Sequence, residues 1–312
     1  MNGKQLTILV VLIGAAALLL SQNQQNKSSD FESWKQKHGI SFASKTENQY
    51  REKIFLANLK EVTDHNSKND RSYSKALNQF SAMTHEEWSQ IYLTLQVDEE
   101  ASKLTSVDTA RLGDIDWESA GAVTPIKDQG ACGSCWAFSA VGGLEGLSKL
   151  ADDELLKFSE QQLLDCAYIN WGNLGCNGGQ MYNALAYVRD NGILEEDKYT
   201  KYSAKRGTCK NKTGPFRISS HTKLDNCNDL ANALSGRPVS VAVDATNWQS
   251  YGSGVFNDCA TQLNHGVLLT GLTDDYWVIK NSWGLKWGLS GYIKLARGNT
   301  CGVCNSACYP NA

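Results

Sequence analysis

The fold is decided by one stretch, Gln129-Gly130-Ala131-Cys132-Gly133-Ser134-Cys135-Trp136-Ala137-Phe138-Ser139, in which a loop turns into a helix. Two glycines predict a tight loop, and from Trp136 onward apolar residues recur at helical spacing. Cys135 therefore lies where the unpaired N–H groups of a helix begin. These groups and the helix dipole stabilise an anion by about 0.3–1 kcal/mol, so we expect a lowered thiol pKa and a nucleophilic sulfur.

Two other interpretations fit the same stretch. Cys132 and Cys135 form a C-x-x-C pair, which also occurs in redox proteins and as one half of a zinc site. A lone C-x-x-C does not separate these chemistries from nucleophilic catalysis. The rest of the chain has to decide between them.

The composition excludes some classes of partner. The chain has 312 residues, enough for two domains or one large one, with a net charge of −3 and a pI near 6.0. Such a chain is not attracted to polyanions. We therefore expect no nucleic acid partner and no binding to an anionic membrane surface.

The N-terminus resembles a secretory signal peptide. Lys4 precedes an apolar run at residues 6–20, which is shorter than the about 20 residues of a usual membrane span. We expect a signal peptide at residues 1–21 and no stable membrane anchor, although an anchor is the alternative. Because secreted proteins meet an oxidising environment, the ten cysteines should form disulfides around one functional thiol. Asn26 and Asn211 lie in glycosylation motifs.

A cysteine nucleophile needs a base, and the sequence has two histidines beyond residue 110. His221 lies in a polar stretch at residues 219–222, which is typical of a solvated surface histidine. His265 directly precedes an apolar strand at residues 266–270, so it lies at the mouth of a strand. This local pattern alone favours a half-buried structural histidine.

Three motifs together resemble those of the papain-like cysteine proteases. They are Cys-Gly-Ser-Cys-Trp at residues 132–136, Leu-Asn-His-Gly-Val at 263–267 and Asn-Ser-Trp-Gly at 281–284. The resemblance implies that Cys135 is the nucleophile and His265 is its base. It implies that Asn281 orients the imidazole and that Trp283 shields their hydrogen bond from water. It also implies that Gln129 and the Cys135 N–H stabilise the oxyanion of acyl transfer.

The same resemblance identifies residues of a substrate cleft. Gly178 and Gly179 would let a substrate backbone approach the wall closely enough to form hydrogen bonds. The pocket for the second residue before the scissile bond would be lined by Met181, Ala245, Leu263 and Ser306, with Trp287 on the leaving-group side. These side chains are apolar or small. We therefore expect apolar or aromatic residues to be preferred over arginine at that position. Only nine residues separate Cys166 from Cys176, with no histidine among them, so the long insertion that makes cathepsin B a dipeptide remover is not expected and endopeptidase activity is favoured.

The segment before residue 111 resembles the inhibitory propeptide of the cathepsin L branch. One helical stripe has the E-R-F-N-I-N pattern with valine in place of isoleucine, namely Glu47, Arg51, Phe55, Asn58, Val62 and Asn66. Asn78-Gln79-Phe80 resembles the G-N-F-D element that follows, with Ala76 and Ala82 where glycine and aspartate are expected. Residues 97–110 are charged and small, which predicts an exposed linker where proteases cut. These features imply a propeptide at residues 22–110 and a peptidase domain at residues 111–312.

The resemblance also implies three disulfides and a free Cys135. The implied pairs are Cys132 with Cys176, Cys166 with Cys209, and Cys259 with Cys301. Cys227, Cys304 and Cys308 lie outside this pattern. Either two of these pair and one remains a thiol, or Cys301, Cys304 and Cys308 belong to a zinc site. The sequence does not say which two would pair.

The family's fold is α+β, with a helical left domain, a β-barrel-like right domain, a cleft between them and a helical propeptide in front. The implied function is that of a cysteine endopeptidase, made as an autoinhibited zymogen, that hydrolyses peptide bonds through a thioester on Cys135. The expected partners are protein and peptide substrates, its own propeptide and cystatin-like inhibitors. We expect a monomer without cofactor or metal, located in the secretory pathway, in a lysosome or vacuole, or outside the cell. The alternatives are a catalytically silent papain-like binding protein and a form that its propeptide inhibits permanently.

Overall fold

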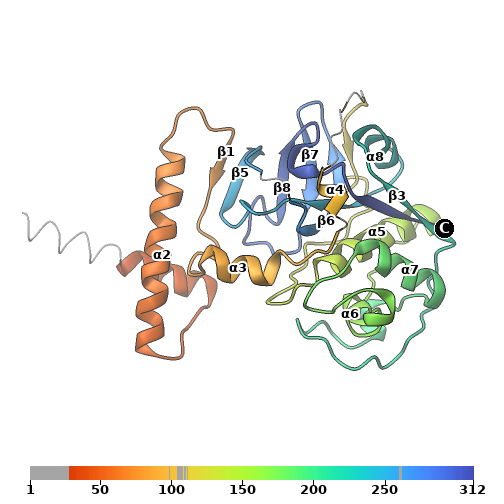
Figure 1. Ribbon diagram of the computed structural model, residues 1–312, viewed down its shortest axis with the longest axis horizontal. Helices are drawn as coiled ribbons and strands as arrows, with labels where there is room; N and C mark the ends of the chain where they lie inside the picture. The colour runs from red at the N-terminus through yellow and green to blue at the C-terminus, as the bar shows by residue number, and fades with distance from the viewer. Residues whose placement is uncertain (1–27, 98, 104–107, 109, 111, 260–261) are drawn as a thin grey trace, which may run out of the picture.

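The computed structural model describes residues 28–97, 99–103, 108, 110, 112–259 and 262–312. The predicted signal peptide at residues 1–21 and the motif at Asn26 lie outside these residues. Figure 1 shows a helical unit beside a body in which a β-sheet packs on helices. Within the described ranges, no helix is both long and apolar enough to cross a membrane.

One half of the body is a nine-stranded sheet in the order β1-β5-β8-β7-β6-β4-β9-β3, with β2 also paired to β6. All pairs are antiparallel except β5 with β8. Strand β6 is buried at every residue, as expected of a strand covered on both faces. The strands are β1 (Tyr73–Lys75), β2 (Ile115–Asp116), β3 (Ser220–Leu224), β4 (Val239–Val243), β5 (Tyr251–Phe256), β6 (His265–Leu272), β7 (Tyr276–Lys280), β8 (Tyr292–Ala296) and β9 (Ala307–Asn311).

The other half is helical and is built around α5 (Cys135–Asp152). This helix is buried from Cys135 to Ser148, because it is apolar on all sides of its first turns. It lies directly on β6, where a Cβ added at Gly142 would come within 2.8 Å of a Leu268 methyl group. The remaining helical segments of the body are α6 (Glu160–Cys166), η1 (Ile169–Trp171), α7 (Met181–Asn191), η2 (Glu196–Lys198), α8 (Cys227–Leu234) and η3 (Thr300–Gly302).

Separate hydrophobic clusters fill the two halves. One includes the inner faces of the sheet and a group of tryptophans, and the other surrounds α5 and α7. The chain thus has two packed units that meet along β6. The predicted α+β, two-part architecture is confirmed.

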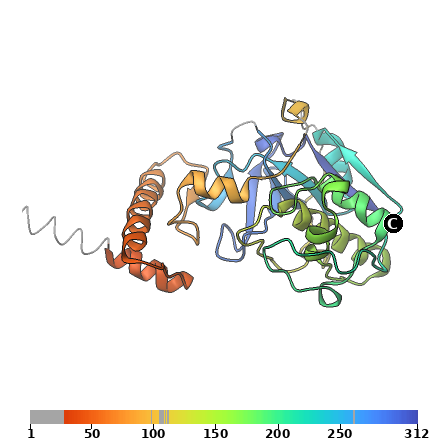
Figure 2. The same ribbon diagram turned by 60° about the horizontal axis from the view of Figure 1, so that its bottom comes forward.

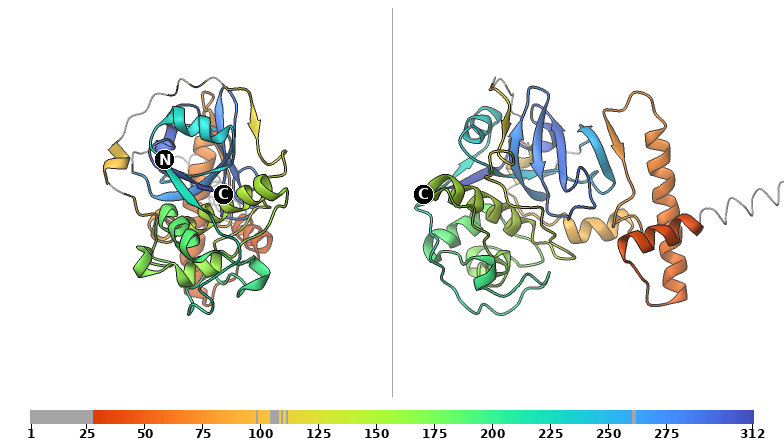
Figure 3. Two further views of the ribbon diagram at one scale, coloured as in Figure 1. Left: turned by 90° about the vertical axis from the view of Figure 1, so that its right-hand side faces the viewer. Right: turned by 180° about the vertical axis from the view of Figure 1, so that it is seen from behind.

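The helical unit in front of the body contains a helix at residues 28–38, then α2 (Lys45–Asn66) and α3 (His85–Tyr92). Figure 2 shows α2 standing apart from the body while α3 reaches toward it, and Figure 3 shows β1 lying along β5. A small cluster of Phe31, Trp34 and Phe55 holds the helices together. The polar residues of the predicted stripe bind the segment that follows, since Asn58 Nδ2 donates to the carbonyls of Ser81 and Met83 at 2.9 and 3.1 Å.

The prediction of an exposed linker at residues 97–110 is wrong for its first part. A short helix, α4 (Glu99–Lys103), begins two residues after Val97. Val97 and Ala101 both pack against the cluster around α5. Val97 precedes α4 and Ala101 lies within it, so two apolar residues of a charged segment contact the same cluster.

The disulfides resolve the questions that the cysteines raised. The structure contains the pairs Cys132–Cys176, Cys166–Cys209, Cys227–Cys304 and Cys259–Cys301, and leaves the thiols of Cys135 and Cys308 free. The first, second and fourth are the pairs implied by the resemblance. A redox pair at Cys132 and Cys135 and a zinc site at Cys301, Cys304 and Cys308 are both excluded, because each would need sulfurs that are bonded elsewhere.

Candidate active site

Cys135 is the first residue of α5, and its side chain is fully buried. The thiol faces the backbone N–H of Gly266, the residue after His265. The crossing of α5 over β6 brings the two motifs together, with the Cys135 carbonyl oxygen 3.4 Å from the position of a Cβ at Gly266. The sequence motifs at residues 135 and 265 therefore lie at one place in the fold.

His265 begins β6 and hydrogen-bonds to Asn281, which follows β7. The two strands are adjacent in the sheet, and His265 Nε2 lies 2.8 Å from Asn281 Oδ1. The Ser282 N–H donates to the same oxygen at 2.8 Å, so the amide oxygen faces the ring. An oxygen that accepts requires the proton on Nε2, which leaves Nδ1 unprotonated in the neutral ring. Nδ1 is buried and forms no hydrogen bond of regular geometry with the described residues, although the Tyr92 backbone is near enough to favour the charged ring.

Trp283 covers this hydrogen bond. Its ring stacks on the His265 imidazole at a centroid distance of 4.6 Å, and the indole is fully buried. Trp287 is also buried; its ring lies edge-on to Trp283 at 4.8 Å, and its Nε1 donates to the Trp248 carbonyl at 3.0 Å. In this covered state Trp287 belongs to an aromatic cluster and not to an open wall.

Gln129 lies in the loop before α5 and is fully buried. Ser282 donates its hydroxyl proton to Gln129 Oε1 at 2.7 Å, while Gln129 Nε2 donates to the Cys132 carbonyl at 3.0 Å. These bonds orient the amide so that its NH₂ group points to the Cys132–Cys135 side of the loop. One loop, which ends at Cys135, thus carries a side-chain N–H and a helix N–H, the kind of donors that acyl transfer needs.

A segment of the front unit runs through the cleft and covers the thiol. The N–H of Leu95 donates to the Asn264 carbonyl at 3.0 Å, and the N–H of Gln96 donates to the Gly179 carbonyl at 3.0 Å. A Cβ at Gly178 would lie 2.0 Å from the Thr94 carbonyl oxygen, so only glycine permits this approach. The glycine pair thus receives a peptide backbone, here from the chain itself.

Two of the four residues predicted to line the pocket for an apolar side chain lie at one cavity. Met181 and Ser306 line one cavity of about 310 Å³ together with Leu95 and Val97. Ala245 and Leu263 do not line it. Ala245 is buried in the core of the sheet half, and Leu263 packs in the cluster around α5 with Met181 and Leu95. Of the four predicted residues, two therefore line this cavity and two are buried in the hydrophobic clusters.

Burial reverses the expected ionisation of the pair. Desolvation raises the pKa of Cys135 to about 11, although the backbone N–H groups of Gly266 and Trp136 favour the thiolate. Desolvation lowers the pKa of His265 to about 4 against the bond to Asn281. In this covered state, burial thus opposes the thiolate that the sequence predicts. With water excluded, the thiol and the imidazole are both neutral.

His221 is not the solvated side chain that its polar sequence predicts. Its ring packs edge-on against Tyr182 at 4.1 Å, and burial lowers its pKa. It is on β3, whereas the thiol is at the start of α5. This position is consistent with a structural role.

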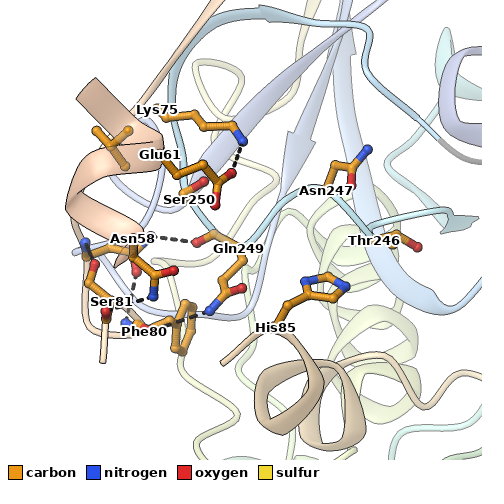
Figure 4. Close-up of a pocket in the computed structure, with 12 residues that line it drawn as sticks. Asn58, Glu61, Lys75, Phe80, Ser81, His85, Thr246, Asn247, Gln249 and Ser250 are labelled. Atoms are coloured by element: carbon orange, nitrogen blue, oxygen red, sulfur yellow. Dashed lines mark hydrogen bonds and ion pairs between the residues drawn. The ribbon is translucent and has the colours of Figure 1, made fainter. Parts of the chain in front are cut away.

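The front unit also contacts the body beside the cleft. Figure 4 shows a cavity of about 240 Å³ between α2 and the loop at residues 246–250, with Glu61 and Lys75 paired on one side and His85 on the other. Asn78 Nδ2 donates to the Gln249 carbonyl at 2.7 Å. The rings of Phe80, Trp88 and Tyr92 surround Trp283 at 5.3–5.8 Å.

Sequence reasoning missed one charged partner in the front unit. Arg51 has no aspartate at position 82 to pair with, and instead its Nη1 bonds to the Ala82 carbonyl and to Glu87 Oε2, at 3.1 and 2.7 Å. Glu87 also closes a capping box with Thr84 at the start of α3. The Thr-x-x-Glu spacing was a signal for the cap, but nothing in it indicates the ion pair.

Comparison with known proteins agrees with this geometry. The family model of papain family cysteine proteases matches residues 113–311, and the model of the cathepsin propeptide inhibitor domain (I29) matches residues 31–88. The chain therefore belongs to the papain family of cysteine proteases.

Similar proteins indicate which branch of the papain family the chain belongs to. The chain is 40% identical to Cathepsin L 2 of Paramecium tetraurelia over 313 residues, which cover 96% of this chain and 99% of that protein. It is 40% identical to digestive cysteine proteinase 1 of Homarus americanus over 308 residues, covering 90% of this chain and 94% of that protein. The solved structure of digestive procathepsin L 3 of Tenebrio molitor matches with a TM-score of 0.82 and 37% identity, covering 92% of this chain and 99% of that one. The protein is a cathepsin L-like cysteine protease in its zymogen form, with its own propeptide as inhibitor.

Proposed function

We propose that this protein is a cysteine endopeptidase in which Cys135, His265, Asn281 and Gln129 carry out the reaction. The observation that carries the proposal is a free thiol at a helix start that faces the N–H of Gly266, directly after a histidine whose Nε2 is bonded to an asparagine. A catalytically silent binding protein is not favoured, because both the nucleophile and its base are present.

Removal of the propeptide admits water and allows the proton of Cys135 to move to His265 Nδ1. The thiolate sulfur then attacks the carbonyl carbon of the scissile bond, while the Cys135 N–H and Gln129 Nε2 stabilise the oxyanion. The imidazolium gives its proton to the leaving amine, and a thioester remains. Water, deprotonated by the same imidazole, hydrolyses the thioester and releases the acid and the free thiol.

The proposed domain boundaries are a signal peptide at residues 1–21, a propeptide at 22–110 and a mature peptidase domain at 111–312. Four disulfides support passage through an oxidising compartment, with a lysosome, a vacuole or the extracellular space as the destination. Protein and peptide substrates and cystatin-like inhibitors are the proposed partners of a monomer, and Asn211 is an exposed glycosylation acceptor.

The proposed preference is for an apolar residue two positions before the scissile bond. Leu95 of the propeptide supports this, since its side chain packs beside Met181 in the cleft. A peptide library should rank leucine or phenylalanine above arginine at that position. Arginine as the best residue would refute the preference.

The central test compares the wild-type zymogen with Cys135→Ala after incubation at mildly acid pH. We expect the wild type to process itself near residue 111 and to cleave a peptide with an apolar residue in the pocket. We expect Cys135→Ala to do neither. Equal hydrolysis by both proteins would overturn the proposal.

A second test concerns the oxyanion. Gln129→Ala should lower kcat by about 10²–10³-fold, because one donor is worth about 3–4 kcal/mol in the transition state. Alkylation of Cys135 by iodoacetamide forms no oxyanion and should stay near the wild-type rate. An equal loss of both activities would show that Gln129 supports the thiol and not the oxyanion.

A further inference from the structure

Tyr202 places its hydroxyl against the loop that precedes Cys135. It lies in the extended segment between η2 and β3, outside every motif that the sequence singled out. Its Oη donates to the Gln129 carbonyl at 2.7 Å and lies 2.6 Å from Ser134 Oγ. A carbonyl only accepts, so the phenol proton is committed to Gln129 and Ser134 must donate to the phenol oxygen. One hydroxyl thus links the two ends of the loop.

These two ends carry the proposed oxyanion donors. The amide side chain of Gln129 is one donor, and the N–H of Cys135, directly after Ser134, is the other. Ser134 is the N-cap residue of α5, yet its hydroxyl makes no capping bond to the helix. Its hydroxyl instead lies 2.6 Å from Tyr202 Oη and, at the longer distance of 3.5 Å, near the Cys132 carbonyl, so the Tyr202 contact sets the entry of the chain into the helix. The Tyr202 hydroxyl bridges the backbone of Gln129 and the side chain of Ser134. The distance between the Gln129 amide and the Cys135 N–H therefore depends on this bridge.

The ring of Tyr202 is itself held in place. It packs edge-on against Phe138, one turn into α5, at a centroid distance of 4.9 Å and an interplanar angle of 86°. Ala204, two residues on, lies so close to the loop that a Cβ at Gly130 would be 3.0 Å from its own Cβ. Burial raises the pKa of the phenol, so it remains a donor throughout the pH range in which a protease works.

We infer that Tyr202 is a positioning residue of the peptidase, whose hydroxyl holds Gln129 and Ser134 in register so that both oxyanion donors point to one place. It acts through these residues and does not touch the reacting atoms. The inference rests on the proposed function and adds to it a residue on a segment far from the catalytic motifs.

The test is Tyr202→Phe in the mature enzyme, which keeps the ring on Phe138 and removes only the hydroxyl. Loss of one such hydrogen-bonded link should lower kcat by about 3- to 10-fold and change KM by less than about twofold. A peptide aldehyde forms a tetrahedral adduct with an oxyanion, so its inhibition constant should rise by the same factor as kcat falls. Alkylation by iodoacetamide should be unchanged.

Tyr199→Phe is the matched control. This tyrosine lies in the same segment, but its hydroxyl donates to Asp165 Oδ2 at 3.1 Å and accepts from the Lys210 N–H at 3.1 Å, away from the loop. It should leave kcat and aldehyde binding at wild-type values. Ser134→Ala should reproduce the loss seen in Tyr202→Phe, and the double variant should be no worse than either single one, because both break one link.

Three outcomes would overturn the inference: a Tyr202→Phe enzyme with wild-type kcat, a parallel fall in alkylation and kcat, or the same loss in Tyr199→Phe. If Tyr202→Phe does not fold, the same measurements of kcat, aldehyde inhibition and alkylation on Ser134→Ala test the inference. Failure of the proposed function is distinct, since the wild-type protein would then show no Cys135-dependent hydrolysis at all.

Discussion

The propeptide meets the peptidase body in two regions that differ in chemistry. The docking body, residues 45–92, places three aromatic rings around Trp283 and pairs its strand β1 with β5 of the body. The cleft segment, residues 93–97, bonds through its backbone to Asn264 and Gly179 and buries the side chain of Leu95 beside Met181. Three buried aromatic rings bury more apolar surface than one leucine. We infer that the docking body supplies most of the affinity and that the cleft segment keeps water from the thiol.

The largest effect should come from the docking body. Trp88 is fully buried and packs against Trp283, so Trp88→Ala should cost about 3–5 kcal/mol. In the zymogen Cys135 is alkylated only when the cleft is open, so its rate of reaction with iodoacetamide at pH 7 should rise by at least about 100-fold. The melting temperature of the zymogen should fall as well. Tyr50→Ala, at an exposed aromatic on α2, should change neither quantity, and a wild-type alkylation rate in Trp88→Ala would contradict the comparison.

The cleft segment should be able to leave the thiol while the docking body stays bound. Leu95 is 7% exposed and packs beside Met181, so Leu95→Asp loses about 1.5–3 kcal/mol of burial at that site. Alkylation of Cys135 in the zymogen should rise by about 10- to 150-fold, while the melting temperature of the zymogen stays near wild type.

Gln96→Ala is the control for this variant, because the hydrogen bond of Gln96 to Gly179 uses its backbone N–H. It should alkylate at the wild-type rate. A fall in melting temperature for Leu95→Asp as large as for Trp88→Ala would mean that the two regions open as one.

The smallest expected effect is on how the stability of the zymogen depends on pH. Partial desolvation raises the pKa of Glu87, but the bonds from Arg51 and from the Thr84 N–H outweigh it and hold the pKa below its ordinary value. Because the pKa of Glu87 is lower in the folded than in the unfolded protein, its carboxylate stabilises the folded zymogen above the ordinary carboxyl pKa. This stabilisation is lost as the pH falls through the lowered pKa. The Glu87 side chain is 34% exposed, so the ion pair contributes at most about 1 kcal/mol.

Glu87→Gln should therefore reduce zymogen stability at pH 7 slightly and flatten the loss of that stability as the pH falls below the ordinary carboxyl pKa of about 4.3. Unfolding by urea at a series of pH values measures this. Glu86→Gln, at the neighbouring carboxylate that does not bond to Arg51, is the matched control. An unchanged pH profile in Glu87→Gln would assign the acid response to other groups.

In the front unit, the sequence pattern predicted the helix but not the contacts between helices. The stripe that includes Arg51 and Asn58 predicted a helix with one functional face, because positions three and four apart must lie together on any helix. It did not predict that Arg51 would pair with Glu87, since α3 approaches α2 only through the chain reversal at residues 67–84. Similarly, the charged composition of residues 97–110 gave no indication that Val97 and Ala101 pack against the cluster around α5.

The sequence by itself determined the elements that carry chemistry: a cysteine at the start of a helix, a histidine and an asparagine at the ends of two strands, and a glycine pair. Spacing, turn residues and local periodicity specify these, because they depend on neighbours along the chain. Only the tertiary structure decided that Cys227 pairs with Cys304, that Ala245 turns into a core, and that Tyr202 supports the loop before Cys135. It also decided the charges of Cys135 and His265, because a pKa depends on how much water remains around a group, and segments distant in the sequence remove that water.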